Sequence, residues 1–214
     1  AAMLLTGFIA QTPPAPSAPS QTPAIEGVRN YTRVDVTIGC AGATEVKALP
    51  NIAKQGFKAV LNLRETTEAG ASIEESRAAS QAAGLKYIHL PFKGSAPTTK
   101  LADEFVWEVN DPANQPLFIH CGSGNRVAAL WLIRRMITDK WTEERAVAEA
   151  RTIGLTSEAL LAASMRRTLE RQRAAQLADG IPDWGTRIDR LERLAALLKE
   201  NEKALCESLQ ADFG

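Results

Sequence analysis

A short apolar segment, a glycine-rich loop and a helical pattern follow one another in the second half of the chain, and together they restrict its fold most. Residues 116–119 form a brief unbroken apolar run that is followed at once by glycines, which predicts a buried strand. A helical pattern occupies residues 127–137. The loop between the two elements consists of Cys121, Gly122, Ser123, Gly124, Asn125 and Arg126.

The composition of this loop favours thiolate chemistry on an anionic group. Glycines allow consecutive backbone N–H groups to point inward, and the start of the following helix adds partial positive charge. These groups stabilise a thiolate on Cys121, and Arg126 adds a planar fork of donors for an oxyanion. We therefore predict Cys121 and Arg126 as catalytic residues. The predicted anion-binding residues are Gly122, Ser123, Gly124 and Asn125. The alternative is an inert buried cysteine.

Strands alternate with helices along residues 28–167. This order predicts an α/β domain of three layers, with a mainly parallel sheet and helices on both faces. We expect strands at 31–38, 57–64, 86–90 and 116–119, a turn at 39–43, and helices at 44–55, 72–83, 98–109, 127–137, 141–151, 157–179 and 186–209. The expected N-caps are Thr44, Thr98 or Thr99, and Thr142, and Pro50 predicts a late start or a kink in the first of these helices. Ligands bind beyond the carboxyl ends of such strands, which is where Cys121 falls.

Both ends of the chain differ from this domain. Residues 1–27 combine an apolar stretch (3–10), typical of the end of a signal peptide, with a linker rich in proline and serine. This pattern predicts a periplasmic or secreted protein, with the cytoplasm as the alternative and no membrane contact once the segment is processed. Residues 168–214 are a predicted helical tail whose apolar positions recur at helical spacing, so self-association through this tail is an alternative to simple packing.

The charge and the cysteine count exclude several classes of function. The formal net charge is +0, which argues against a nucleic-acid partner. Three cysteines and two histidines are too few and too scattered for a disulfide framework or a zinc site, so we predict no metal and no cofactor. The expected partner is a small anionic substrate or a phosphorylated molecule.

Two further residues lie at the edge of the sheet where the functional site is predicted. Cys40 lies in the predicted turn after the first strand, where it is either a resolving cysteine for Cys121 or a small apolar turn residue. Arg64 closes the second strand and either reaches a bound anion or forms an ordinary salt bridge. His89 is predicted to be a packed core histidine.

Four segments of the domain resemble the phosphatase-like domain of bacterial beta-lactamase hydrolase-like proteins, a branch near the dual-specificity and tyrosine phosphatases. The resemblance covers about residues 28–164 and rests on residues 30–34, 39–43, 56–64 and 120–126. It implies a cysteine-phosphatase-like fold and a hydrolase that attacks phosphate monoesters through Cys121. It also implies a supporting role for His120, which in such phosphatases helps to hold the loop and to lower the pKa of the thiol.

The loop departs from the pattern of those phosphatases in two ways. Only four residues separate Cys121 from Arg126, where the phosphatase pattern has five, and the shorter spacing also resembles the loop of rhodaneses, whose cysteine carries a persulfide. The aspartic acid that such phosphatases use as general acid has no counterpart in residues 92–97. A sulfurtransferase and a non-catalytic module that binds an oxyanion or a partner therefore stand as alternatives to the phosphatase.

A second resemblance concerns the tail. Residues 173–175, 179–182, 187–191 and 211–214 are similar to the first helices of an aldehyde dehydrogenase. That family's nucleotide-binding fold and catalytic cysteine would follow only after this point. We therefore interpret the tail as a fragment without dehydrogenase chemistry.

Overall fold

The computed structural model of the chain describes residues 24–93, 95–180 and 182–213. The chain divides into two compact units, with the boundary between Thr168 and Leu169. The predicted signal-peptide remnant and most of the linker lie outside the described residues, so export stays a prediction.

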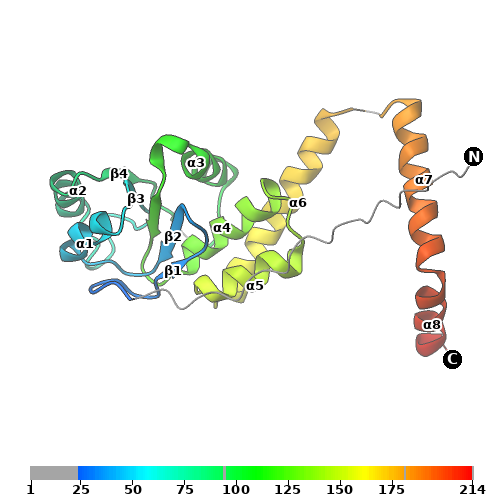
Figure 1. Cartoon of the computed structure of the whole chain (residues 1–214), viewed down its shortest axis with the longest axis horizontal. Helices are drawn as coiled ribbons and strands as arrows, with labels where there is room; N and C mark the ends of the chain where they lie inside the picture. The colour runs from blue at the N-terminus through cyan, green and yellow to red at the C-terminus, as the bar shows by residue number, and fades with distance from the viewer. Residues whose placement is uncertain (1–23, 94, 181, 214) are drawn as a thin grey trace, which may run out of the picture. The chain divides into compact units, whose positions relative to one another are not determined.

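The first unit is built on a five-stranded sheet with the order β1-β2-β5-β3-β4 (Figure 1). Its strands are β1 (Thr32–Arg33), β2 (Ile38–Ala41), β3 (Ala59–Asn62), β4 (Lys86–His89) and β5 (Leu117–His120). Only β1 runs antiparallel to its neighbour; β2, β5, β3 and β4 are parallel. This topology confirms the predicted mainly parallel α/β sheet.

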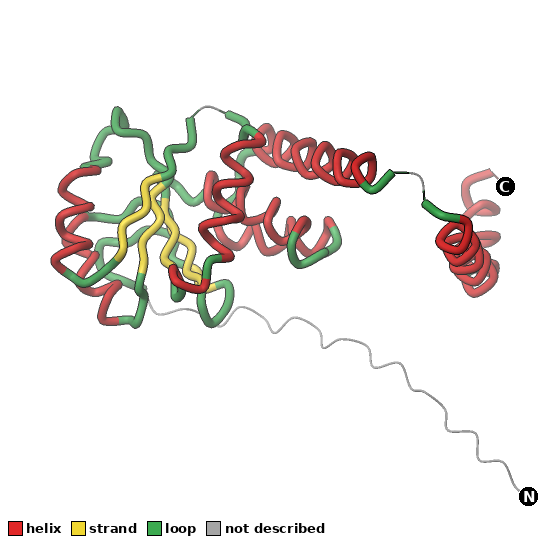
Figure 2. The backbone as a smooth tube through the Cα atoms, turned by 90° about the horizontal axis from the view of Figure 1, so that it is seen from above, coloured by secondary structure: helices red, strands yellow, loops and turns green. Residues whose placement is uncertain are grey.

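Helices cover both faces of the sheet, as Figure 2 shows. One apolar cluster joins α1 and α2 to one face, and another joins α3, α4, α5 and the first part of α6 to the other. The helices of this unit are α1 (Leu49–Lys54), α2 (Ile73–Ala82), α3 (Thr99–Asn110), α4 (Asn125–Ile137), α5 (Glu143–Ile153) and the part of α6 (Glu158–Ala178) up to Thr168, with short 3-10 turns at Val46–Ala48 and Pro112–Asn114.

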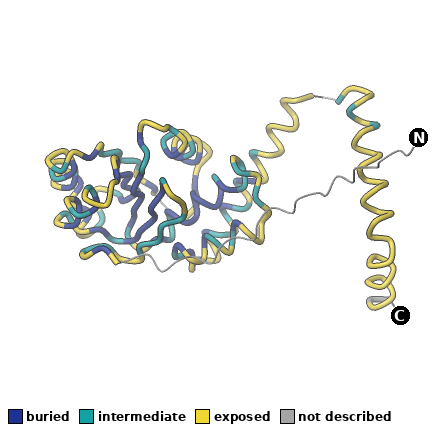
Figure 3. Tube along the Cα trace, viewed as in Figure 1, coloured by how far each residue is buried: buried dark blue, intermediate teal, exposed yellow. Residues whose placement is uncertain are grey.

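Strand β5 and helix α4 form the centre of the unit. β5 pairs with a strand on each side, and all four of its residues are buried (Figure 3). The side chains of residues 127–133 in α4 are fully buried as well. A strand buried on both faces needs a continuous apolar run, which explains why this segment was recognisable in the sequence.

The predicted strand 31–38 is wrong in its extent, because the structure splits this segment into β1 and β2. Between them the Asp35 carboxylate accepts the backbone N–H of Thr37 at 2.8 Å, which closes a turn. The second strand then continues through Ala41, so the predicted turn at 39–43 begins later than expected. The alternation of β-branched residues carried no signal for this reversal.

Two predicted helices also differ from the structure. The helix at 44–55 begins late, at Leu49, with Pro50 in its first turn, and Thr44 does not cap it. The helix at 186–209 is interrupted at Asn201 and forms α7 (Trp184–Glu200) and α8 (Glu202–Phe213). By contrast, the predicted N-caps are confirmed at Thr98 and Thr142, whose hydroxyls accept backbone N–H groups of Leu101 and Arg145.

The second unit presents an apolar stripe to solvent. Its exposed large apolar residues are Leu169, Leu177, Trp184, Leu191, Leu194, Leu197, Leu198, Leu205 and Leu209. Self-association through this stripe stays a prediction, as does the likeness of the tail to an aldehyde dehydrogenase. Among the described helices, none is both long enough and apolar enough to span a bilayer.

Candidate functional site

Cys121 lies directly beyond the carboxyl end of the central strand. Its backbone N–H donates to the carbonyl of Ala41 at 3.3 Å, and the carbonyl of His120 accepts the N–H of Leu63 at 2.9 Å. The pairing with β2 and β3 therefore continues up to the cysteine on both sides. The sheet therefore fixes the backbone position of Cys121.

The loop after Cys121 turns back over the thiol and enters α4. The N–H of Gly124 donates to Cys121 Sγ at 3.2 Å, and α4 begins at the next residue. The thiol is thus placed beside a backbone donor at the start of a helix, both of which favour negative charge. Its side chain is 0% exposed, so a ligand reaches it only when a neighbouring group moves.

Gly124 is required by its conformation and by its surroundings. Its φ is +99°, and a Cβ there would lie 2.8 Å from the carbonyl oxygen of Ile153. We expect Gly124→Ala to destabilise the protein by about 2–4 kcal/mol, because left-handed strain adds to a backbone clash. Gly84→Ala is the matched control, since Gly84 has φ +76° and no atom within 4 Å of such a Cβ. Urea unfolding should show the larger loss at Gly124, and equal losses would contradict this account.

The side chains of Asn125 and Asn30 form hydrogen bonds that support the loop. Asn125 accepts the N–H groups of Thr156 (2.8 Å) and Ser157 (3.0 Å) through Oδ1, and its Nδ2 donates to the Ser123 hydroxyl at 3.3 Å. Asn30 Nδ2 donates to the Ser123 carbonyl at 3.0 Å. The structure therefore ties Asn125 to the segment before α6, and its hydrogen bonds support the loop.

Arg126 is paired with a carboxylate that the sequence analysis did not single out. Its Nη1 and Nη2 donate to the two carboxylate oxygens of Glu68 at 2.5 and 2.7 Å. Nη1 also donates to the carbonyls of Leu63 (3.3 Å) and Phe92 (3.1 Å). These carbonyls follow β3 and β4, so the ends of two strands and an acidic side chain together orient the guanidinium.

The two charges stabilise each other strongly. The hydrogen bonds from Arg126 lower the pKa of the Glu68 carboxyl from its ordinary 4.5 to about 2, against the effect of partial burial. The bonds to Glu68 raise the pKa of Arg126 in turn, and the Cys121 side chain contributes to the same shift. In the structure, Arg126, which was predicted to bind an anion, is paired with the carboxylate of Glu68.

Arg64 organises the loop that carries Glu68. Its guanidinium donates to the carbonyls of Ala69 (2.6 Å) and Gly70 (2.7 Å), and Nε donates to Glu68 at 3.3 Å. Of the two predicted roles for Arg64, the salt bridge is therefore present. Spacing along the sequence did not point to Glu68, because it lies in the loop six residues past the end of β3, and only the tertiary structure brings it to Arg126.

His120 is buried and neutral. Burial, aided by the positive charge of Arg64, lowers its pKa from 6.5 to about 3, and a hydrogen bond to the Cys121 backbone offsets only part of this shift. The ring therefore carries no charge at neutral pH and does not stabilise a thiolate as an imidazolium would. Its Nδ1 has no hydrogen-bond partner among the described residues.

The neutral state of His120 makes stability depend on pH. The unfolded chain takes up a proton on this histidine near pH 6.5, whereas the folded chain does so only near pH 3. Stability should therefore fall as the pH drops from 6.5, by up to about 1.4 kcal/mol per pH unit. Glu68 changes the slope only below its ordinary pKa of 4.5. Urea unfolding between pH 7 and 5 measures the effect, which His120→Gln should remove and His89→Gln should keep.

Cys40 belongs to the core of the sheet. It pairs with Ile119, two residues before Cys121, which implies a Cα–Cα separation of about 8 Å from Cys121. A disulfide needs a separation below about 7 Å. Burial also raises the pKa of the Cys40 thiol well above its ordinary value. These observations favour the packing role that was one of its two predicted roles.

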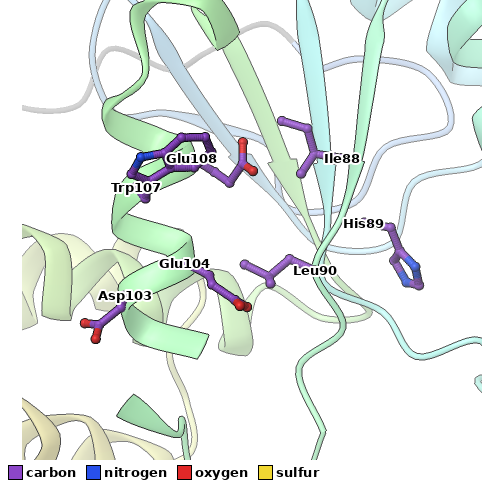
Figure 4. A pocket seen from close by; sticks show the side chains of 7 residues that line it. All are labelled: Ile88, His89, Leu90, Asp103, Glu104, Trp107 and Glu108. Carbon is purple, nitrogen blue, oxygen red and sulfur yellow. The ribbon is translucent and has the colours of Figure 1, made fainter. Parts of the chain in front are cut away.

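A separate groove lies between β4 and α3 (Figure 4). Its volume is about 500 Å³, and its lining residues are Ile88, His89, Leu90, Asp103, Glu104, Trp107 and Glu108. Cys121 and Arg126 do not line it. His89 is only half-buried, and its Nε2 lies 2.8 Å from the Arg64 carbonyl, so the prediction of a packed core histidine is wrong. Within the described residues, no cluster of acidic, histidine and cysteine side chains fits a metal ion.

Comparison with known proteins identifies relatives of the first unit. The family described as "Beta-lactamase hydrolase-like protein, phosphatase-like domain" matches residues 31–138. The Beta-lactamase hydrolase-like protein of Agrobacterium fabrum is 31% identical over 106 aligned residues, and the match covers 47% of this chain and 24% of the relative. The chain thus spans about a quarter of the length of that protein.

Solved structures share the fold at low identity. The core catalytic domain of the PP-IP phosphatase SIW14 from S. cerevisiae, in complex with citrate, has a TM-score of 0.58 and 19% identity, covering 74% of this chain and 98% of that one. A cysteine-to-serine variant of P. aeruginosa TpbA, in complex with pTyr, has a TM-score of 0.53 and 15% identity, covering 70% and 91%. These likenesses confirm the predicted cysteine-phosphatase-like fold.

Proposed function

Because the chain belongs to the family of phosphatase-like domains of beta-lactamase hydrolase-like proteins, we propose that it hydrolyses phosphate monoesters with Cys121 as the nucleophile. The observation that carries the proposal is the hydrogen bond from the Gly124 N–H to Cys121 Sγ at the start of α4. A backbone donor and a helix N-terminus favour the thiolate, which is the reactive form of cysteine.

In the proposed reaction Cys121 attacks the phosphorus atom and forms a sulfur–phosphorus bond, while the bond to the ester oxygen breaks. Water then attacks the phosphorus, and phosphate leaves with regeneration of the thiolate. Arg126 and the loop N–H groups hold the phosphoryl oxygens. Arg126 suits this role because two backbone carbonyls orient it, so little reorganisation is needed when it pairs with an anion.

The proposed substrates are small anionic or phosphorylated molecules. Structures of related fold are described with phosphotyrosine or with citrate, both of which present several anionic oxygens to the protein. The planar fork of Arg126 can bind such oxygens in pairs. We do not extend the proposal to nucleic acids, because the formal net charge of the chain is +0.

The four-residue spacing between Cys121 and Arg126 favours a second candidate function. This second candidate is a sulfurtransferase, in which Cys121 takes a sulfane sulfur from thiosulfate or a persulfide and passes it to a thiol. The third candidate is a module that binds an oxyanion without catalysing a reaction.

Two assays of the full chain separate these functions. One measures phosphate release from an aryl phosphate, and the other measures thiocyanate formation from thiosulfate and cyanide. The proposal expects turnover in the first assay and none in the second. Turnover only with thiosulfate would replace the phosphatase by a sulfurtransferase. If both assays are negative while phosphate still binds, the binding module is the correct reading.

A further inference from the structure

The loop after β4 supplies no acid for the leaving group. Residues 90–98 contain no aspartate or glutamate, and the first acidic side chains beyond them, Asp103 and Glu104, lie on α3. Figure 4 shows these two carboxylates at the groove beside β4, which Cys121 and Arg126 do not line. A proton donor for an ester oxygen must therefore come from another element.

Glu68 is the carboxylate that the fold brings to the loop. Both of its oxygens bind Arg126, and Oε2 lies 3.5 Å from the point that a Cβ on Gly122 would occupy. Gly122 directly follows Cys121, so this carboxylate lies beside the loop that would bind the phosphoryl group. Its location satisfies the first requirement for a general acid, which is reach.

The remaining contacts of Glu68 do not depend on Arg126. The N–H of Glu65 donates to Oε1 at 2.7 Å, and Arg64 Nε donates to Oε2 at 3.3 Å. Arg126 is likewise held by the carbonyls of Leu63 and Phe92. Each partner of this ion pair therefore retains hydrogen bonds of its own after the pair has opened, and an incoming anion can replace Glu68 on the guanidinium of Arg126.

Opening the pair changes the protonation of Glu68. Arg126 is the largest cause of the low pKa of this carboxyl. Once a phosphoryl group occupies the arginine, Glu68 loses that partner and faces a like charge instead, and both effects favour its protonated form. Binding of the substrate would thus create the acid that the first chemical step needs.

We propose that Glu68 is the general acid of this phosphatase, released from Arg126 by the substrate's own phosphoryl group. The inference rests on the proposed function. As the bond between phosphorus and the ester oxygen breaks, its electron pair stays on that oxygen, which takes the proton of Glu68 and leaves as an alcohol or phenol. In the second step the Glu68 carboxylate accepts a proton from the attacking water, which restores the acid and the Cys121 thiolate after phosphate departs.

The test compares two leaving groups in the full chain. Phenyl phosphate needs a proton on its leaving oxygen, whereas 2,4-dinitrophenyl phosphate releases a stable anion without one. Glu68→Gln keeps a hydrogen-bonding side chain beside Arg126 but removes the proton. We expect kcat for phenyl phosphate to fall about a hundredfold or more, with a change of no more than a few-fold for the dinitrophenyl ester.

Two further variants complete the design. Glu75→Gln removes the same charge at an exposed position in the first turn of α2, and both substrates should react as with the original protein. Glu68→Asp retains a carboxyl group, and it should recover part of the activity on phenyl phosphate, which also shows that the loop still folds.

Each remaining outcome counts against the proposal. Equal losses on both esters in Glu68→Gln would show that Glu68 only positions Arg126. Unchanged rates on both esters would place it outside the reaction. If the original protein hydrolyses neither ester, the proposed function itself fails, which is distinct from both of these results.

Discussion

Replacing Cys121 with serine is expected to reduce the hydrolysis of an aryl phosphate by at least about 10⁴-fold. A serine hydroxyl stays protonated beside the Gly124 N–H. Among the described hydrogen bonds of the Cys121 side chain, none involves a side chain that could act as a base for the serine. The variant should bind phosphate about as well as the original protein, because the loop N–H groups and Arg126 remain. Steady-state kinetics and phosphate-binding calorimetry measure the two quantities.

The matched control for this variant is Cys206→Ser. Cys206 is exposed on α8, in the second unit, and its loss should leave the rate unchanged. The account of Cys121 would be contradicted if Cys121→Ser retained more than a small fraction of the activity. The same holds if alkylation at neutral pH modified Cys206 while Cys121 stayed unreactive throughout turnover.

Arg126→Lys is expected to reduce kcat/KM by about 10²–10³-fold, which corresponds to about 3–4 kcal/mol of transition-state stabilisation. Lysine keeps the positive charge, so its ion pair with Glu68 is weakened rather than abolished. It loses the planar fork that contacts both oxygens of Glu68 and the carbonyls of Leu63 and Phe92. The loss should therefore fall on kcat as well as on KM.

An exposed arginine of α6 provides the control for that substitution. Arg166→Lys makes the same chemical change at a distance from the loop and should alter neither kinetic constant. An Arg126→Lys variant with the original kcat would show that charge alone is needed at this position. In that case the planar geometry of the guanidinium would make no contribution to kcat.

The sequence was sufficient for the architecture around the central strand because the signals there are local. The apolar run of β5, the glycines after it and the helical spacing of α4 each predict one element, and right-handed crossovers then leave few arrangements. Thr98 and Thr142 were recognisable as N-caps for the same reason. Their hydroxyls satisfy N–H groups only three residues away.

The predictions that were wrong or absent concern contacts between segments that are distant in sequence, or small local reversals of the chain. Asp35 closes a turn inside what resembled one continuous strand, and Asn201 interrupts a helix whose apolar spacing continues past it. Glu68 could not be assigned to the site from spacing alone, because its partner Arg126 is 58 positions away. Its role follows only once β3 and β5 are known to be neighbours.

The most direct test of the account is the chemical state of Cys121 during turnover. The full chain is mixed with an aryl phosphate, quenched in acid within one turnover, and the peptide that contains Cys121 is analysed by mass spectrometry. The account predicts a transient mass increase of one phosphoryl group on Cys121 that is absent from Cys121→Ser. A turnover that proceeds with Cys121 unmodified at every time point, or with one added sulfur atom in its place, would contradict it.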